Sequence, residues 1–283
     1  MIRRLAIALA MILITVTEGL AQREDLTVMT FNIRYAHTTP PNLWPDRRAV
    51  VRQVIVDSGA DLVGTQEGLY TQIRDLDEAL PDFEWIGLGR EGGSNGEYMA
   101  IFYRPIRFVP LEYDHFWLSD TPSTIGSATW GNQIPRMVTW VRFLDRLSGR
   151  EFYFVNTHFD HQSQPAREKS AQLLLERIAD FDPDLPVIVT GDFNSEAPSN
   201  PVYQALTAPE ALSDTWVETN EAEPEFGTFH GFEGLEAAAG RARIDWILVK
   251  GPVETIETEI ITTEVDGQYP SDHFPVTARL RFR

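Results

Sequence analysis

The chain of 283 residues contains no cysteine. This absence excludes disulfides, cysteine-based zinc sites, iron–sulfur clusters, thiol nucleophiles and a lipid-modified N-terminal cysteine. It fits an oxidising compartment without requiring one. Any metal site must therefore be built from oxygen ligands and histidine nitrogens.

Basic residues are scarce. The chain has 24 Lys and Arg against 42 Asp and Glu, which gives a formal net charge of −18. A protein this acidic is repelled by polyphosphate backbones unless a local basic patch or bound cations intervene. Nucleic acid is therefore a disfavoured partner, though not an excluded one. An acidic cleft that captures divalent cations is favoured.

Long hydrophobic runs are absent beyond the N-terminus. Leu5–Val16 is uncharged and mostly apolar, follows two arginines, and precedes small residues at Gly19 and Ala21. This pattern predicts a secretory signal peptide over residues 1–21. Twelve residues fall short of the ~20 that span a bilayer, so an uncleaved anchor is the disfavoured alternative. We expect a soluble protein that is secreted or periplasmic.

Residues 22–283 are predicted to form a single domain, because no repeat and no Pro/Gly/Ser linker of ten or more residues interrupts them. Few helical segments lie among many strand-like ones, which predicts packed sheets with helices outside, in an α/β or α+β sandwich. The expected strands are 26–33, 61–66, 83–87, 99–103, 136–143, 151–156, 186–190, 244–249 and 276–282. The expected helices are 46–58, 71–79, 164–179 and 201–206.

Six apolar segments begin or end in groups that bind metal or phosphate. Strand ends meet at one rim of a sheet sandwich, so these groups can converge. The inventory of carboxylates, amides and a few histidines suits Mg²⁺, Mn²⁺ or Ca²⁺ better than Zn²⁺. Each group alone is weak evidence, since Asp and Asn also stabilise turns. The groups are Asn32, Gln66-Glu67, the run from Asn156 to His161, Gly191-Asp192-Phe193-Asn194, Arg243-Ile244-Asp245 and Ser271-Asp272-His273.

The order of these groups resembles the endonuclease/exonuclease/phosphatase (DNase I-like) superfamily, in the form of a secreted bacterial-type member. The resemblance runs from Asn32 to His273 and implies a four-layered α/β/β/α sandwich of two mixed sheets flanked by helices. It also implies a divalent-metal-dependent hydrolase in which water attacks phosphorus. It does not select the substrate, since relatives cleave DNA, sphingomyelin, inositol phosphates and poly(A) with the same centre.

The resemblance also implies roles for single residues. Glu67 is expected to be the main ligand of Mg²⁺ (or of Mn²⁺ or Ca²⁺), with Asn32 and Asp272 nearby. Few further protein ligands are needed, because Mg²⁺ keeps several waters.

The catalytic set implied by the resemblance has five members. One carboxylate orients or deprotonates the nucleophile, and an amide beside it holds phosphate or water. One histidine contacts a phosphate oxygen while an aspartate bonds its other ring nitrogen. A second histidine stabilises charge or protonates the leaving group. In that order they are Asp192, Asn194, His273, Asp245 and His158.

Six further residues are candidates for substrate binding. Two of them extend the Thr-His-Phe segment and form either a second metal or substrate subsite or a solvated loop. Two arginines either hold a phosphate or pair with a carboxylate. Two residues in long loops stack on a base or sugar ring, although core burial is the commoner fate of a tryptophan. In that order they are Asp160 and His161, Arg34 and Arg243, and Trp130 and His230.

A phosphodiester is the favoured substrate, with a phosphomonoester as the alternative and a small sugar or inositol phosphate still open. The stretches beside the motifs are acidic, including four Glu from Glu218 to Glu225. Acidic surroundings repel a nucleic-acid backbone, so a nuclease is the less favoured interpretation. A lipid substrate would need an exposed hairpin. Tyr113–Leu118 is a candidate, but a buried strand is favoured there.

Two rival functions differ in class. A binding module with a dead centre is disfavoured, because every expected catalytic position holds the expected residue type. A zinc hydrolase built on His158 and His161 is disfavoured, because these side chains point to opposite faces if the strand continues. The sequence indicates no oligomeric state.

Overall fold

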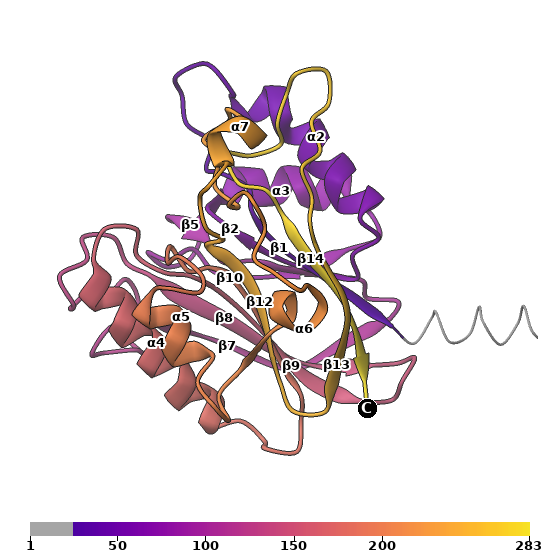
Figure 1. Cartoon of the computed structure of the whole chain (residues 1–283), viewed down its shortest axis with the longest axis vertical. Coiled ribbons are helices and arrows are strands. Elements are labelled where there is room, and N and C mark those ends of the chain that lie inside the picture. The colour runs from indigo at the N-terminus through magenta and orange to yellow at the C-terminus, as the bar shows by residue number, and fades with distance from the viewer. Residues whose placement is uncertain (1–24) are drawn as a thin grey trace, which may run out of the picture.

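Two six-stranded mixed sheets pack face to face, and helices cover both outer faces (Figure 1). The computed structural model describes residues 25–283, so the predicted signal peptide lies outside the described residues. The expected four-layered α/β/β/α fold is confirmed. Within residues 25–283 no helix has the length and apolar character needed to cross a membrane.

The first sheet has strand order β13-β14-β1-β2-β6-β4. Its outer face is covered by α2 (Trp44–Asp57) and α3 (Tyr70–Ala79), whose Val51, Ile55 and Leu76 pack on Met29 and Phe31 of the sheet. The strands are β13 (Val253–Ile260), β14 (Val276–Phe282), β1 (Leu26–Asn32), β2 (Leu62–Gln66), β6 (Ile101–Tyr103) and β4 (Glu84–Ile86).

The second sheet has strand order β11-β12-β10-β9-β8-β7. Its outer face is covered by α4 (Gln164–Ala179) and α5 (Pro201–Leu206), and Ser163 caps α4 by accepting from Ala166 N–H. The strands are β11 (Ser213–Asp214), β12 (Asp245–Lys250), β10 (Val187–Asp192), β9 (Glu151–His158), β8 (Met137–Asp145) and β7 (Phe108–Trp117). A small pair, β3 (Gly68–Leu69) and β5 (Glu97–Tyr98), and two short helices, α6 (Thr215–Thr219) and α7 (Leu235–Ala238), are the remaining elements of residues 25–283.

The structure differs from the strand predictions at the sheet edges. β13 was not predicted, because its three glutamates hide the apolar alternation of a strand that needs only one buried face. β7 confirms a strand at Tyr113–Leu118, but the expectation of burial is wrong for its first half. Within this segment Tyr113 is 59% exposed, since β7 is an edge strand, and the first buried residue is Phe116.

A buried polar cluster joins the two sheets inside an otherwise apolar interface. The Asn156 amide on β9 donates to the Thr65 and Ala100 carbonyls and accepts from Gln66 Nε2 at 2.7 Å. Gly64 makes this approach feasible, because a Cβ there would overlap Asn156 Oδ1. The cluster therefore holds the ends of β2 and β9 at a defined separation.

Replacing Asn156 by alanine should lower the free energy of unfolding by about 3 kcal/mol, because it leaves buried donors and acceptors without partners. Urea denaturation followed by circular dichroism measures this loss. Gln172→Ala, on an exposed position of α4, is the matched control and should cost less than about 0.5 kcal/mol. Equal stability of the two variants would contradict a role for the cluster.

Candidate active site

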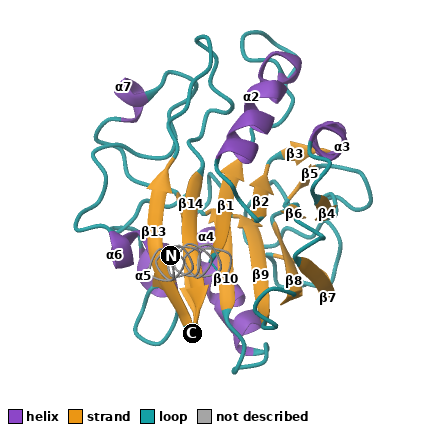
Figure 2. Cartoon of the chain, turned by 90° about the vertical axis from the view of Figure 1, so that its right-hand side faces the viewer, coloured by secondary structure: helices purple, strands orange, loops and turns teal. Residues whose placement is uncertain are grey.

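Strand register brings the polar strand ends to one edge of the sandwich. Asn32 pairs with Gln66 across the parallel strands β1 and β2. In the other sheet Asp192 pairs with His158 on one side and with Asp245 on the other. Figure 2 shows β1 and β2 running up to this edge and β14 starting from it. Residues from both sheets therefore converge there.

Asn32 stands at the point where the two sheets meet. Its buried Nδ2 lies 3.1 Å from Glu67 Oε1, 2.9 Å from Asp192 Oδ2 and 3.5 Å from His273 Nε2. Its Oδ1 accepts from the Arg34 backbone N–H at 3.0 Å. One amide thus brings two carboxylates and an imidazole from three separate segments within hydrogen-bond reach of a single atom.

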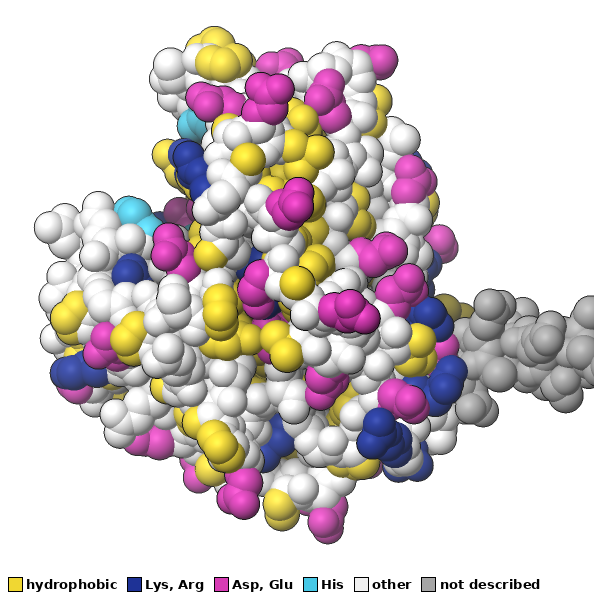
Figure 3. Space-filling view, viewed as in Figure 1, with side chains coloured by type: hydrophobic (Ala, Val, Ile, Leu, Met, Phe, Trp, Pro, Cys, Tyr) yellow, Lys and Arg dark blue, Asp and Glu magenta, His cyan; other side chains and the backbone are white. Residues whose placement is uncertain are grey.

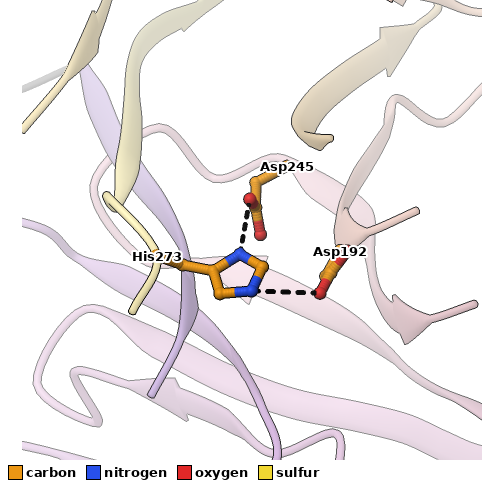
Figure 4. Close-up of side chains that lie close together, drawn as sticks. All are labelled: Asp192, Asp245 and His273. Atoms are coloured by element: carbon orange, nitrogen blue, oxygen red, sulfur yellow. Dashed lines mark hydrogen bonds and ion pairs between the residues drawn. The ribbon is translucent and has the colours of Figure 1, made fainter. Parts of the chain in front are cut away.

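His273 lies between two aspartates (Figure 4). Its Nδ1 is 2.9 Å from Asp245 Oδ2, and its Nε2 is 3.8 Å from Asp192 Oδ2. Burial disfavours the charged imidazole, but the Asp245 and Asp192 carboxylates outweigh burial and raise the pKa of His273 to about 10. The ring is therefore an oriented, charged donor whose Nε2 faces Asp192.

Asp192 is buried among like and unlike charges. Burial, together with the neighbouring Asp245 carboxylate, raises its pKa to about 7. Its Oδ1 accepts from the Asn194 backbone N–H at 2.9 Å, and His158 Nε2 lies 3.4 Å from its Oδ2. Burial and the nearby Arg136 hold the pKa of His158 well below its usual value, so this ring is neutral.

A second carboxylate pair lies beside Asn32. Arg34 reaches both members, with 3.5 Å from Nη1 to Glu67 Oε2 and 3.5 Å from Nε to Asp272 Oδ2. Both carboxylates are buried, whereas the Arg34 side chain is 31% exposed. Burial works against the charged form of Glu67, but Arg34 and His273 outweigh it and lower its pKa.

These side chains fit a hard divalent cation. Among residues 25–283, the ligand atoms of Asp192, Asp245 and His273 lie within 4.8 Å of one another. The His273 ring in that group is already bonded to Asp245 and charged, which suits a phosphate oxygen better than a metal. Glu67, with Asn32 and Asp272, offers oxygen atoms without a thiol, which is the donor set that Mg²⁺ and Mn²⁺ prefer.

Three residues of this site have strained backbone conformations. Arg34, Glu67 and Asn194 have positive φ angles of 52°, 64° and 49°, a conformation that costs side-chain-bearing residues free energy. Glu67 directly follows β2, and Arg34 and Asn194 each lie two residues beyond the ends of β1 and β10. The surrounding hydrogen bonds, such as Asn194 Nδ2 to Phe159 O at 3.1 Å, hold these turns in place.

The site opens into a cavity of about 410 Å³. Figure 3 shows histidine side chains at a recess on the left of the molecule. The cavity is lined by side chains that carry the chemistry and by a ring of aromatic, aliphatic and cationic groups. These are Arg34, Tyr35, Glu67, Glu97, Ile134, Arg136, His158, His161, Asp192, Asn194, Phe229, Ile244 and His273.

Arg47 of α2 positions the loops around the centre and was missed from the sequence. Its guanidinium is buried, and within residues 25–283 it donates only to backbone carbonyl oxygens, which link the segment after β1 to the segment before His273. Burial lowers its pKa to about 10. Its acceptors are the carbonyls of Ile33, Arg34, Tyr35, Asn42 and Pro270.

Arg47→Met should lower the free energy of unfolding by about 3 kcal/mol, because several buried carbonyls lose a charged donor. The neighbouring Arg48→Met removes an exposed arginine 3.6 Å from Asp75 and should cost less than about 1 kcal/mol. Urea titrations of both variants give the comparison. A loss for Arg47→Met no larger than that for Arg48→Met would show that these carbonyls do not need the guanidinium.

Four of the residues predicted for substrate binding do not line this cavity. Arg243 is 1% exposed and pairs with Asp214 and Glu223 at 2.8 Å each, so it has carboxylate partners. Trp130 Nε1 donates to Asp120, and its ring packs against the hydrophobic core under α4. His230 is buried and stacked on Phe274. Asp160 accepts from the backbone N–H groups of Gln162 and Ser163. Arg34 and His161 do line the cavity.

Arg136 and Glu97 line the cavity but were not predicted. Arg136 directly precedes β8, which is antiparallel to β9, so it lies at the same edge as His158. A charged residue at the start of an antiparallel neighbour is a signal that the sequence carries. Glu97 sits on the short strand β5, whose partner could not be inferred from composition.

Comparisons with known proteins agree with this geometry. The model of the Endonuclease/Exonuclease/phosphatase family matches residues 29–273. An endonuclease/exonuclease/phosphatase from Bacteroides vulgatus is 35% identical, with TM-score 0.85, over 92% of this chain and 99% of that chain. A mannosyl-6-phosphatase from Bacteroides thetaiotaomicron is 34% identical, with TM-score 0.85, over 91% and 100%. An uncharacterised protein of Acanthamoeba polyphaga mimivirus is 28% identical over 163 residues, which are 54% of this chain and 60% of that protein.

Proposed function

The chain belongs to the endonuclease/exonuclease/phosphatase family, whose members hydrolyse phosphoester bonds, and from this premise we propose that it hydrolyses a small soluble phosphoester with the help of a divalent cation. One observation carries the proposal. Glu67, Asp192 and His273 come from distant parts of the chain and line one cavity.

Asp192 is placed to orient the attacking water or to take a proton from it. Its Oδ2 faces the cavity among Asn32, His158 and His273, while its Oδ1 is fixed by the Asn194 N–H. A carboxylate held in this way reacts from one orientation, which is the requirement for general-base catalysis.

His273 supplies positive charge at the phosphate. Asp245 holds Nδ1, so the ring presents Nε2–H to a phosphoryl oxygen, and His158 lies on the other side of Asp192. Glu67, with Asn32 and Asp272, would hold the cation. A bound divalent cation offsets the negative charge that gathers on phosphorus oxygens during attack.

A sugar phosphate is the substrate class that we propose. The mannosyl-6-phosphatase shares 34% of aligned residues over nearly the whole of both chains, which supports a related substrate. A cavity of about 410 Å³ suits a molecule of that size, and Tyr35 and Phe229 offer aromatic faces on its wall for a sugar ring.

Nucleic acid and lipid substrates are less well supported. The net charge of −18 opposes a polyanionic strand. The exposed apolar side chains of β7, such as Leu111 and Tyr113, lie on the edge strand of the second sheet, and no β7 residue is among those lining the cavity.

We further propose export from the cytoplasm, which the predicted signal peptide over residues 1–21 supports. N-terminal sequencing of protein recovered from outside the cytoplasm should begin directly after Ala21. An N-terminus at Met1 would contradict cleavage at this site.

A substrate panel tests the proposed function. Purified protein with Mg²⁺ or Mn²⁺ is incubated with mannose 6-phosphate, inositol phosphates, sphingomyelin, RNA and plasmid DNA. We expect phosphate release from the sugar phosphate that stops when the metal is chelated. Cleavage of DNA or RNA alone would contradict the proposed substrate, and no cleavage of any substrate would contradict the activity.

A further inference from the structure

Arg136 lies on the cavity wall beside the catalytic groups. It immediately precedes β8, and the pairing of Val138 with Thr157 sets that end of β8 against the end of β9, where His158 stands. His158 in turn lies 3.4 Å from Asp192. The Arg136 charge also helps to lower the pKa of His158, which places the guanidinium in the surroundings of that ring.

The Arg136 guanidinium is fixed but incompletely paired. The residue is 3% exposed. Nη2 lies 2.9 Å from His161 Nδ1, and Nε lies 3.6 Å from Asp160 Oδ2. Neither Nη1 nor Nε has a hydrogen-bond partner among residues 25–283. A buried cationic donor without an acceptor is costly, and its position on the cavity wall leaves a ligand as the natural acceptor.

The nearby carboxylates are engaged elsewhere. Both oxygens of Glu97 accept from Arg90, at 2.6 and 2.8 Å. Asp160 Oδ1 accepts from the backbone N–H groups of Gln162 and Ser163 at the start of α4, and Asp160 does not line the cavity. An anion in this part of the cavity therefore meets the guanidinium face rather than a free carboxylate.

His161 adds a second donor. An arginine nitrogen always donates, so the contact with Arg136 makes His161 Nδ1 an acceptor and places the ring proton on Nε2. The His161 side chain is exposed and lines the cavity. Arg136 and His161 thus bring two N–H donors, Nη1 and Nε2, to the cavity that Glu67 also lines.

We propose that Arg136 and His161 form an anion subsite for the third unesterified oxygen of a terminal phosphate, so that the enzyme selects phosphomonoesters over phosphodiesters. This inference rests on the proposed function and specifies its substrate class. A monoester near neutral pH carries close to two negative charges on three unesterified oxygens, as a phosphorylated side chain does. A diester has one charge and would place an ester carbon against Arg136, which would leave Nη1 buried without an acceptor.

Paired chromogenic substrates test the selection. With Mn²⁺, kcat/KM is measured for p-nitrophenyl phosphate and for bis-p-nitrophenyl phosphate, which share a leaving group. Arg136→Gln should lower the monoester value by roughly 10- to 100-fold and the diester value by less than about 3-fold, in line with loss of a charge-assisted hydrogen bond. Arg136→Lys keeps the charge, so its monoester kcat/KM should lie between those of the wild type and of Arg136→Gln. Arg146→Gln, at the exposed residue just after the far end of β8, should change neither value.

Binding of inorganic phosphate gives a readout that does not depend on turnover. Isothermal titration in the presence of Mg²⁺ should show a Kd about 10-fold or more weaker in Arg136→Gln than in the wild type. Circular dichroism melting checks folding. If Arg136→Gln does not fold, the exposed His161→Ala is used instead, and its Kd for phosphate should also be weaker than that of the wild type, by a smaller factor.

The outcomes separate this inference from the proposed function. Unchanged phosphate affinity together with an unchanged monoester-to-diester ratio would overturn the subsite while leaving the hydrolase intact. A wild type that cleaves neither ester would overturn the proposed function, and the phosphate titration would still decide whether Arg136 binds an anion.

Discussion

Asp192→Asn should lower kcat by about 10³-fold while leaving divalent-metal affinity within a few-fold of the wild type. The substitution keeps the side-chain volume between Asn32 and His158 but removes the oxygen that can take a proton. General-base catalysis contributes roughly 10²- to 10⁴-fold, so a loss of this size is expected. Initial rates of phosphate release and calorimetric Mn²⁺ titration measure the two quantities.

An exposed aspartate provides the matched control. Asp184→Asn, in the loop between α4 and β10, changes the same atoms far from the cavity and should keep full activity. Turnover of Asp192→Asn within a few-fold of this control would exclude Asp192 as the group that activates water.

Glu67→Gln should abolish the response to metal. The wild-type protein should gain thermal stability as Mg²⁺ or Mn²⁺ is added, because a ligand that binds the folded state stabilises it. The variant keeps an oxygen that can accept from Asn32 Nδ2 but loses the charge that holds the cation. We expect no metal-dependent shift in Tm and a fall in kcat/KM of about 10³-fold, since a bound metal contributes several kcal/mol to the transition state.

Chelation and a charge-matched variant complete that experiment. EDTA should reduce wild-type activity to the level of Glu67→Gln, and added Mn²⁺ should restore only the wild type. Glu91→Gln, which is exposed, should behave as the wild type. A Glu67→Gln protein that still gains stability and activity with Mn²⁺ would place the metal elsewhere.

The layered fold was predictable because its strands are apolar and end abruptly. Nearly every residue of β1, β2, β9 and β10 is buried, so composition alone marks these strands. The edge strands β13 and β7 carry charged and exposed residues, since an edge strand packs on fewer neighbours. Their partners could be found only from the complete sheet.

The convergence of Asn32, Asp192 and His273 was also predictable, because each lies next to a buried strand end. The sequence left open whether Arg34 and Arg243 hold a phosphate or pair with a carboxylate, and the structure places them differently. Arg34 lines the cavity, whereas Arg243 is buried against carboxylates that lie 20 and 29 positions away. Ion pairs between distant segments leave no periodic pattern, so sequence spacing alone cannot assign them.

The guanidinium groups that organise the site were not predictable in the same way. Arg47 lies on a helix among exposed arginines, and only the folded chain shows that it reaches the Pro270 carbonyl 223 positions away. Arg136 required knowledge that β8 runs antiparallel to β9. Both act through contacts that exist only once the loops are closed around them.

Anomalous diffraction from crystals grown with Mn²⁺ tests the central claim most directly. We predict a manganese peak at the Glu67 carboxylate, beside Asn32 and Asp272. A peak at Asp192, Asp245 and His273 instead, or no peak near Glu67 in protein whose activity requires the metal, would contradict the assignment of the catalytic centre.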